Sequence, residues 1–105
     1  MTFTKKHKYL VENLYKGLVN LNNGFDSPYI YYFNESDFEI ILNRIEKYGI
    51  TISGIEPWKD GEYYDVRVME EYPDEKFWYR RVFENYKALK ENLQYSASYI
   101  LPEQD

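Results

Sequence analysis

"ITISGIEPWKDGEYYDVRVMEEY" spans residues 50–72, and the predicted fold depends on this stretch. Residues 50–58 are rich in β-branched and aromatic side chains, and Gly54 interrupts them where a β-bulge would fit. The sequence KDG at 59–61 is typical of a tight turn, because an Asp-Gly pair adopts the positive φ angles that short hairpin loops require. Residues 62–71 predict a second strand, so the stretch as a whole predicts an antiparallel hairpin.

Side chains alternate between the two faces of a strand, which divides residues 62–72 into two rows. We expect the more apolar row to belong to the core, and this row consists of Tyr64, Val66 and Val68. The opposite row, which we expect to face solvent or a partner, consists of Tyr63, Asp65, Arg67 and Met69. The N-terminal helix could equally well cover this second row, and the pattern alone does not separate the two interpretations.

Two helices are predicted before the hairpin. Residues 5–21 carry an apolar stripe with a polar back, which is the pattern of an amphipathic helix. NNGFDSP at 22–28 favours a turn, and YIYYF at 29–33 favours a short strand. A second helix is expected over about 36–48, where Ser36 and Glu39 fit a capping box and Gly49 fits a left-handed C-terminal stop.

The region after the hairpin allows two interpretations. Residues 75–83 could continue as a strand because they are rich in aromatic side chains. We favour a helix, since a stripe of apolar residues recurs at helical spacing after the Pro-Asp-Glu sequence at 73–75. The stripe consists of Trp78, Val82, Tyr86, Leu89 and Leu93. A last strand is predicted over 95–101, where Tyr and Ser residues alternate, and Pro102 and the acidic tail end it.

Apart from the N-terminal helix, the predicted order is strand, helix, strand, strand, helix, strand. This order is that of a ferredoxin-like βαββαβ sandwich, an α+β fold whose antiparallel sheet has helices on one face. The N-terminal amphipathic helix would then be a natural cover for the open face of the sheet. A chain of 105 residues without a recognisable linker predicts a single domain over 1–105.

The composition narrows the possible chemistry. The chain contains no cysteine, which excludes disulfides, Cys-ligated zinc and thiol catalysis. Together with the lack of an apolar run near the ~18 residues of a membrane span and of a signal-peptide pattern, this predicts a soluble cytoplasmic protein.

Signatures of catalysis are almost absent. His7 is the single histidine and is expected to be solvated in a basic segment, without a local metal partner. No glycine-rich nucleotide loop occurs, and Gly17 has no turn or cap to explain it, so close packing is expected there. The remaining catalytic possibility is a carboxylate pair of Asp65 with Glu70 or Glu71, holding Mg²⁺ or exchanging protons. We therefore expect a protein without enzymatic activity, cofactor or metal.

Charge gives the strongest indication about a partner. The net charge is −5, and residues 56–75 contain eight acidic against two basic residues, a local net charge of −6. Such a surface repels nucleic-acid phosphates and attracts a basic protein, although acidic stretches are often only solvated. Aromatic strands of ferredoxin-like RNA-binding modules would need basic residues, whereas Arg67 is the single basic residue of 62–72.

These features predict an immunity-type inhibitor that neutralises a basic bacterial toxin, in particular a nuclease, by occluding it as a monomer. Nuclease toxins are cationic because they hold phosphate, so their inhibitors present carboxylates and aromatic side chains. The alternative is a ferredoxin-like sensor or assembly domain that binds a small ligand or self-associates. The predicted partner-binding residues are Glu56, Trp58, Asp60, Glu62, Tyr63, Asp65, Arg67, Glu70, Glu71 and Tyr72.

Overall fold

Strand β1 (Thr51–Lys59) lies at the centre of a four-stranded antiparallel sheet. On one edge it pairs with two short strands, β2 (Glu62–Tyr63) and β3 (Arg67–Val68), and on the other edge with β4 (Gln94–Ile100). The computed structural model describes residues 4–102, so the predicted acidic tail at 103–105 lies outside the described residues, as do positions 1–3. The predicted α+β class is confirmed.

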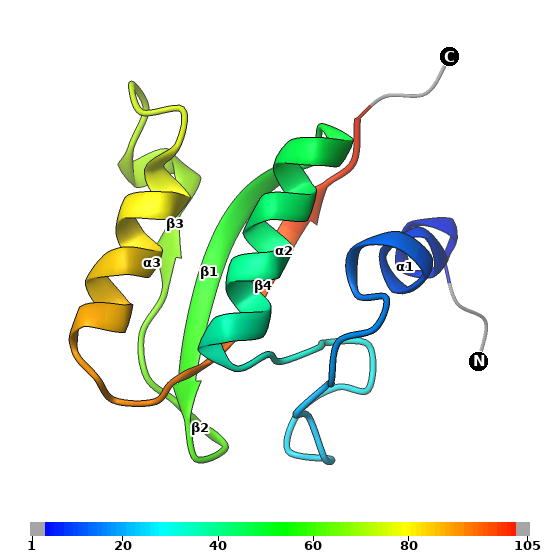
Figure 1. Cartoon of the computed structure of the whole chain (residues 1–105), viewed down its shortest axis with the longest axis horizontal. Helices are drawn as coiled ribbons and strands as arrows, with labels where there is room; N and C mark the ends of the chain where they lie inside the picture. The colour runs from blue at the N-terminus through cyan, green and yellow to red at the C-terminus, as the bar shows by residue number, and fades with distance from the viewer. Residues whose placement is uncertain (1–3, 103–105) are drawn as a thin grey trace.

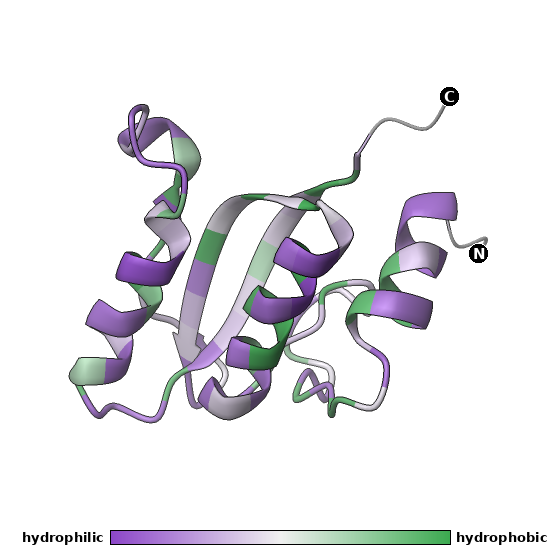
Figure 2. Ribbon diagram, turned by 45° about the horizontal axis from the view of Figure 1, so that its top comes forward, coloured by the Kyte–Doolittle hydropathy of each residue, from purple (hydrophilic) through white to green (hydrophobic). Residues whose placement is uncertain are grey.

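Two helices cover one face of this sheet (Figures 1 and 2). Helix α2 (Glu35–Tyr48) begins after Asn34, whose side-chain oxygen accepts a hydrogen bond from the Asp37 amide at 2.8 Å. The predicted cap at Ser36 is therefore wrong by two residues, because Asn34 satisfies the free amides of the first turn. The predicted stop is confirmed, since Gly49 adopts a left-handed φ of 68°.

Helix α3 (Trp78–Ala88) resolves the ambiguity at 75–83 in favour of a helix. Trp78, Val82 and Tyr86 form the expected buried stripe, whereas Leu89 follows the helix and is half exposed. Leu93 is buried but lies between the helix and β4, so the predicted stripe is too long. The main core lies between these helices and the sheet. At its centre the ring of Tyr95 stacks on Phe38 at 5.0 Å and meets Phe83 edge-on at 5.2 Å, and all three side chains are fully buried.

The hairpin turn is confirmed, but the second strand is interrupted. Asp60 and Gly61 have φ angles of 52° and 78°, and Lys59 pairs with Glu62 as a two-residue loop requires. The amides of Tyr64 and Asp65 then both donate to the Pro57 carbonyl, at 3.1 and 3.3 Å. Two donors on one acceptor are the signature of an extra residue in the edge strand, which reverses the alternation beyond it.

The predicted division into two rows is consequently wrong. Val66 and Val68 lie on the sheet face opposite the helices, where Val68 Cγ1 would be 3.6 Å from a Cβ built on Gly54, and Tyr64 is exposed. Met69 instead packs against the main core. Pro57 explains the break. In an antiparallel strand the N–H and the carbonyl of one residue face the same edge, and proline has no N–H, so Pro57 can accept a hydrogen bond from the neighbouring strand but cannot donate one to it. The bulge predicted at Gly54 is confirmed by a register shift between β1 and β4.

The N-terminal helix is shorter than predicted and lies elsewhere. It consists of α1 (Lys5–Tyr9) and a π-helical turn η1 (Leu10–Leu14), and the helix does not extend to residue 21. Gly17 has a φ of 80°, and no atom lies within 4 Å of the position that a Cβ would occupy, so a left-handed backbone explains this glycine rather than close packing. The helix lies beside α2, where Arg44 donates to the Leu14 and Lys16 carbonyls, and it does not cover the open face of the sheet (Figure 1).

The strand predicted at 29–33 is reduced to a single bridge between Phe33 and Tyr95. Two asparagine side chains from the preceding loop form hydrogen bonds with the backbone of this segment. The Asn20 side chain accepts from the Tyr32 amide, and the Asn22 side chain donates to the Ile30 carbonyl. These side-chain bonds thus take the place of the inter-strand hydrogen bonds that the aromatic residues predicted. The ferredoxin-like order is not confirmed, because its first strand is missing as a regular element.

Candidate partner-binding surface

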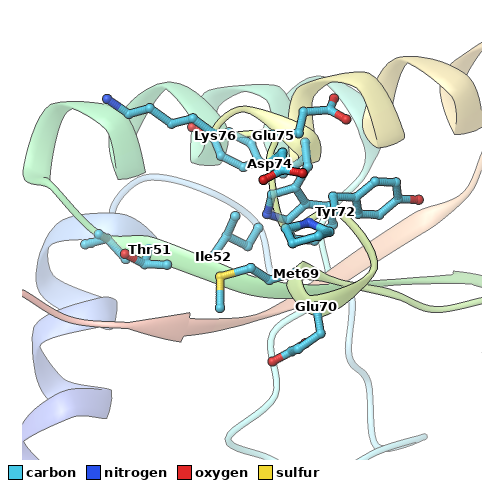
Figure 3. Close-up of a pocket in the computed structure, with 12 residues that line it drawn as sticks. Thr51, Ile52, Met69, Glu70, Tyr72, Asp74, Glu75 and Lys76 are labelled. Atoms are coloured by element: carbon cyan, nitrogen blue, oxygen red, sulfur yellow. The ribbon is translucent and has the colours of Figure 1, made fainter.

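A cleft of about 680 Å³ opens where β1 begins, between this strand, the 3₁₀ turn η2 (Met69–Glu71) and the loop that leads into α3 (Figure 3). It is lined by Ile50, Thr51, Ile52, Met69, Glu70, Tyr72, Pro73, Asp74, Glu75, Lys76, Trp78 and Tyr79. We call it the end cleft. Its floor is apolar, since Ile52 and Trp78 belong to the main core and Met69 packs against it.

One wall of the end cleft is held rigidly by stacked groups. The Tyr72 ring lies parallel to the Trp78 ring at 5.4 Å, and the Arg81 guanidinium lies 5.2 Å from the centre of the Tyr72 ring. Glu75 fixes Arg81 with two hydrogen bonds of 2.7 and 2.9 Å, and these bonds hold the pKa of Glu75 below its ordinary value. Tyr72 is therefore oriented before any partner arrives, which lowers the entropic cost of binding.

Two carboxylates at the end cleft are not neutralised. Asp74 and Glu70 make no side-chain hydrogen bond or ion pair with residues 4–102, and Figure 3 shows Asp74 above the floor while Glu70 points away from it. Lys76 is the one basic residue of the lining, and its ammonium lies 5.4 Å from the centre of the Phe77 ring. Acidic groups beside an apolar floor favour a cationic side chain with an aliphatic stem, such as lysine or arginine.

The hairpin tip carries a second pair of free carboxylates, on Asp60 and Glu62. Both residues are exposed, and neither carboxylate makes a hydrogen bond or ion pair within the described part of the chain. The neighbouring Lys59 forms its ion pair with Glu91, and its attraction to Asp60 offsets the two carboxylates only in part. The tip is therefore a negatively charged point at the opposite end of β1 from the end cleft.

Other predicted site residues are engaged within the protein. Asp65 accepts hydrogen bonds from the Tyr86 hydroxyl at 2.9 Å and from Arg67 at 3.2 Å. Partial burial and the bond to Asp65 raise the pKa of Tyr86 well above its ordinary value, so the phenol remains a donor. The predicted pairing of Asp65 with Glu70 or Glu71 is not formed, because Glu71 accepts from the Val68 amide at 3.1 Å.

The remaining predicted residues lie on the open face of the sheet. Trp58 donates its indole N–H to Glu56 at 2.9 Å and packs against Phe25 and Tyr32. Tyr63, the cross-strand neighbour of Trp58, is 57% exposed. The ten predicted residues are thus distributed over the end cleft, the hairpin tip, the Asp65 network and the open face, and only Glu70 and Tyr72 meet in the end cleft.

Sequence reasoning missed Asp74 and Trp78 as cleft residues. Asp74 contributed only to the local charge and to the predicted start of the helix, and Trp78 only to the helical stripe of α3. The signal that could have found them is the turn sequence Tyr72-Pro73-Asp74, which lies a few residues before α3 and brings an acidic side chain close to Trp78, the first buried residue of that helix. His7 also differs from expectation, since it is buried against the rings of Tyr29 and Tyr31 instead of solvated.

Within residues 4–102, no group of three His, Asp or Glu side chains is arranged to hold a metal ion. In the same residues, no helix has both the length and the apolar character needed to cross a bilayer. Comparisons with protein-family models, with curated protein sequences and with solved structures gave no match.

Proposed function

We propose that the protein is an immunity-type inhibitor, a cytoplasmic protein without catalytic activity that binds a basic toxin, in particular a nuclease, and occludes it. The observation that carries the proposal is the end cleft, where the unpaired carboxylate of Asp74 lies above an apolar floor with a fixed Tyr72 ring, and the unpaired carboxylate of Glu70 points outward from the lining. A lysine or arginine of the partner would place its stem on this floor and its charge beside Asp74.

The free carboxylates of the hairpin tip support the same proposal. Asp60 and Glu62 lie at the opposite end of β1 from the end cleft. The molecule therefore has two negatively charged sites, the end cleft and the hairpin tip. Exposed charges of one sign accelerate association with a partner of the opposite sign and make the rate dependent on salt. The bound state would be a one-to-one complex, because the acidic surface disfavours contact with a second copy.

The test is a binding measurement with the protein encoded by the neighbouring gene, at low and at physiological salt. Asp74→Lys is expected to weaken binding about tenfold or more, because a like charge then faces the partner. The matched control is Glu84→Lys, which makes the same charge change on the exposed side of α3, away from the end cleft, and should change affinity less than about twofold. A lack of any salt-sensitive partner would contradict the proposal.

The second candidate is an assembly domain that self-associates through its open sheet face. Exposed apolar side chains on that face, such as Val66, favour it. Light scattering distinguishes the two candidates, because the inhibitor is expected to be a monomer and the assembly domain an obligate dimer.

A further inference from the structure

The sheet face opposite α2 and α3 carries a groove of about 350 Å³, whose lining shares Glu70 with the end cleft. Figures 1 and 2 show that the described helices lie on the other face or beside the sheet. The floor of the groove is formed by Gly54, Ser96 and Ser98 of the paired strands β1 and β4, and its walls include Ile30, Val66 and Val68. We call it the sheet groove.

The sheet groove is hollow because its floor lacks large side chains. Gly54 has no side chain, and Ser96 and Ser98 are small, whereas the same strands carry Ile55 and Tyr95 on the helix face. The walls are apolar and accessible, with Ile30 39% and Val66 37% exposed. Apolar walls around a floor of small residues allow a bulky side chain or an extended backbone to approach the sheet closely.

Charge selects among possible occupants of the sheet groove. Its charged lining residues are Glu56 and Glu70, and its lining contains no lysine, arginine or histidine. A second copy of the chain would bring the same two carboxylates against each other, and nucleic acid would bring phosphates against them. A segment that combines apolar and basic side chains matches both the walls and the charge.

We propose that the sheet groove binds an extended segment of the partner protein in which apolar and basic residues alternate. The apolar side chains lie between Ile30 and Val66 over the serine floor, and the basic side chains reach Glu56 and Glu70. Glu70 lines both the sheet groove and the end cleft, so one partner can occupy the two sites continuously. This inference rests on the proposed function for the basic nature of the partner, and adds a second, apolar contact.

The experiment uses the full chain labelled with ¹⁵N and a synthetic peptide that alternates lysine with valine. Amide shifts are expected to change at Gly54, Ser96 and Ser98. Val66→Ser should lower the affinity for the peptide about tenfold, since it removes one buried valine contact. Ile40→Ser on α2 is the matched control, because Ile40 is also 37% exposed but lies outside the groove lining, and it should leave the affinity unchanged.

A second peptide, alternating glutamate with valine, tests the charge argument and should bind at least tenfold more weakly. Equal binding of both peptides, shifts confined to residues of the end cleft, or no shifts at all would each overturn the inference. Shifts confined to the end cleft would reject the sheet groove but leave the proposed function standing. A salt-sensitive partner whose binding is unaffected by Asp74→Lys but weakened by Val66→Ser would support the sheet groove and reject the end cleft as the binding site. A dimer in light scattering that Val66→Ser dissociates would identify a second copy as the occupant and reject the partner segment.

Discussion

The two faces of the sheet are built from the same strands but differ in how side chains fill them. On the helix face, Ile55 and Tyr95 are fully buried beneath α2 and α3, and large side chains fill the space. On the open face, the same strands present Gly54, Ser96 and Ser98, and apolar side chains such as Val66 remain accessible. Strand alternation thus separates a face that stabilises the fold from a face that can be changed at little cost to stability.

The largest expected effect comes from removing a ring on the helix face. Phe83→Ala should lower the free energy of unfolding by about 3–5 kcal/mol, because Phe83 is fully buried against Phe38 and Tyr95 and its loss leaves a cavity. On the open face, Val66→Ala should cost less than about 1 kcal/mol. Urea unfolding followed by circular dichroism measures both.

Equal losses for the two substitutions would show that the open face also belongs to the core. If Phe83→Ala prevents folding altogether, Phe83→Leu keeps the comparison measurable, with an expected loss of about 1 kcal/mol.

The helix face was also the more predictable one. The second predicted helix coincides with α2 and ends at Gly49 as expected, and its apolar residues Phe38, Ile41, Leu42 and Ile45 are buried, because burial and periodicity coincide where one helix packs on one sheet. The alternating residues of β4 and the two-residue loop Asp60-Gly61 were equally clear. In these regions each local preference agrees with the packing around it.

The errors arose where backbone hydrogen bonds decide the structure instead of side-chain pattern. Alternation alone assigned Val66 and Val68 to the core, because it cannot show that Tyr64 and Asp65 share one acceptor on Pro57. In the same way, the aromatic run at 29–33 does not show that Asn20 and Asn22 satisfy its backbone. The error in alternation also affected the predicted site. The row predicted to meet a partner contains Asp65, which instead accepts a hydrogen bond from Tyr86 of α3.

The next largest effect is expected at this link between the hairpin and the helix layer. Tyr86→Phe removes the 2.9 Å hydrogen bond to Asp65 and should cost about 1–2 kcal/mol, because the acceptor is charged and only partly exposed. The matched control is Tyr63→Phe, since no residue of the described chain bonds the Tyr63 hydroxyl, and its effect should stay within about 0.5 kcal/mol. Similar losses for both would show that the Asp65 network does not stabilise the hairpin.

A smaller effect should appear as a pH dependence within the helix layer. Hydrogen bonds from Arg80 and Tyr79 hold the pKa of Glu46 below its ordinary value of 4.5, although partial burial opposes them. The contribution of Glu46 is therefore complete above pH 4.5 and is lost as the pH falls through the lowered pKa. Because the side chain is about one-third exposed, this contribution should be below about 1 kcal/mol.

Glu46→Gln measures this contribution by urea unfolding at a series of pH values. The difference from the unmodified protein should be largest near neutrality and should vanish in acid. Glu84→Gln changes an exposed glutamate on α3 that makes no hydrogen bond or ion pair within residues 4–102, and it should show no such trend. A difference that grows as the pH falls would contradict the assigned direction.

The smallest effect on stability, and the sharpest separation of stability from binding, is expected at Gly54. Its φ is not in the left-handed region, and a Cβ there would meet Val68 Cγ1 at 3.6 Å and the Arg67 carbonyl oxygen at 3.7 Å, which are ordinary contacts. Gly54→Ala should therefore change the free energy of unfolding by less than about 1 kcal/mol and could stabilise the chain by restricting its unfolded state. The added methyl group would occupy space at the floor of the sheet groove, so the substitution should lower the affinity for the lysine–valine peptide severalfold. A large loss of stability with unchanged binding would reverse the assignment, because Gly54 would then be a structural requirement of the bulge and not the floor of a binding site.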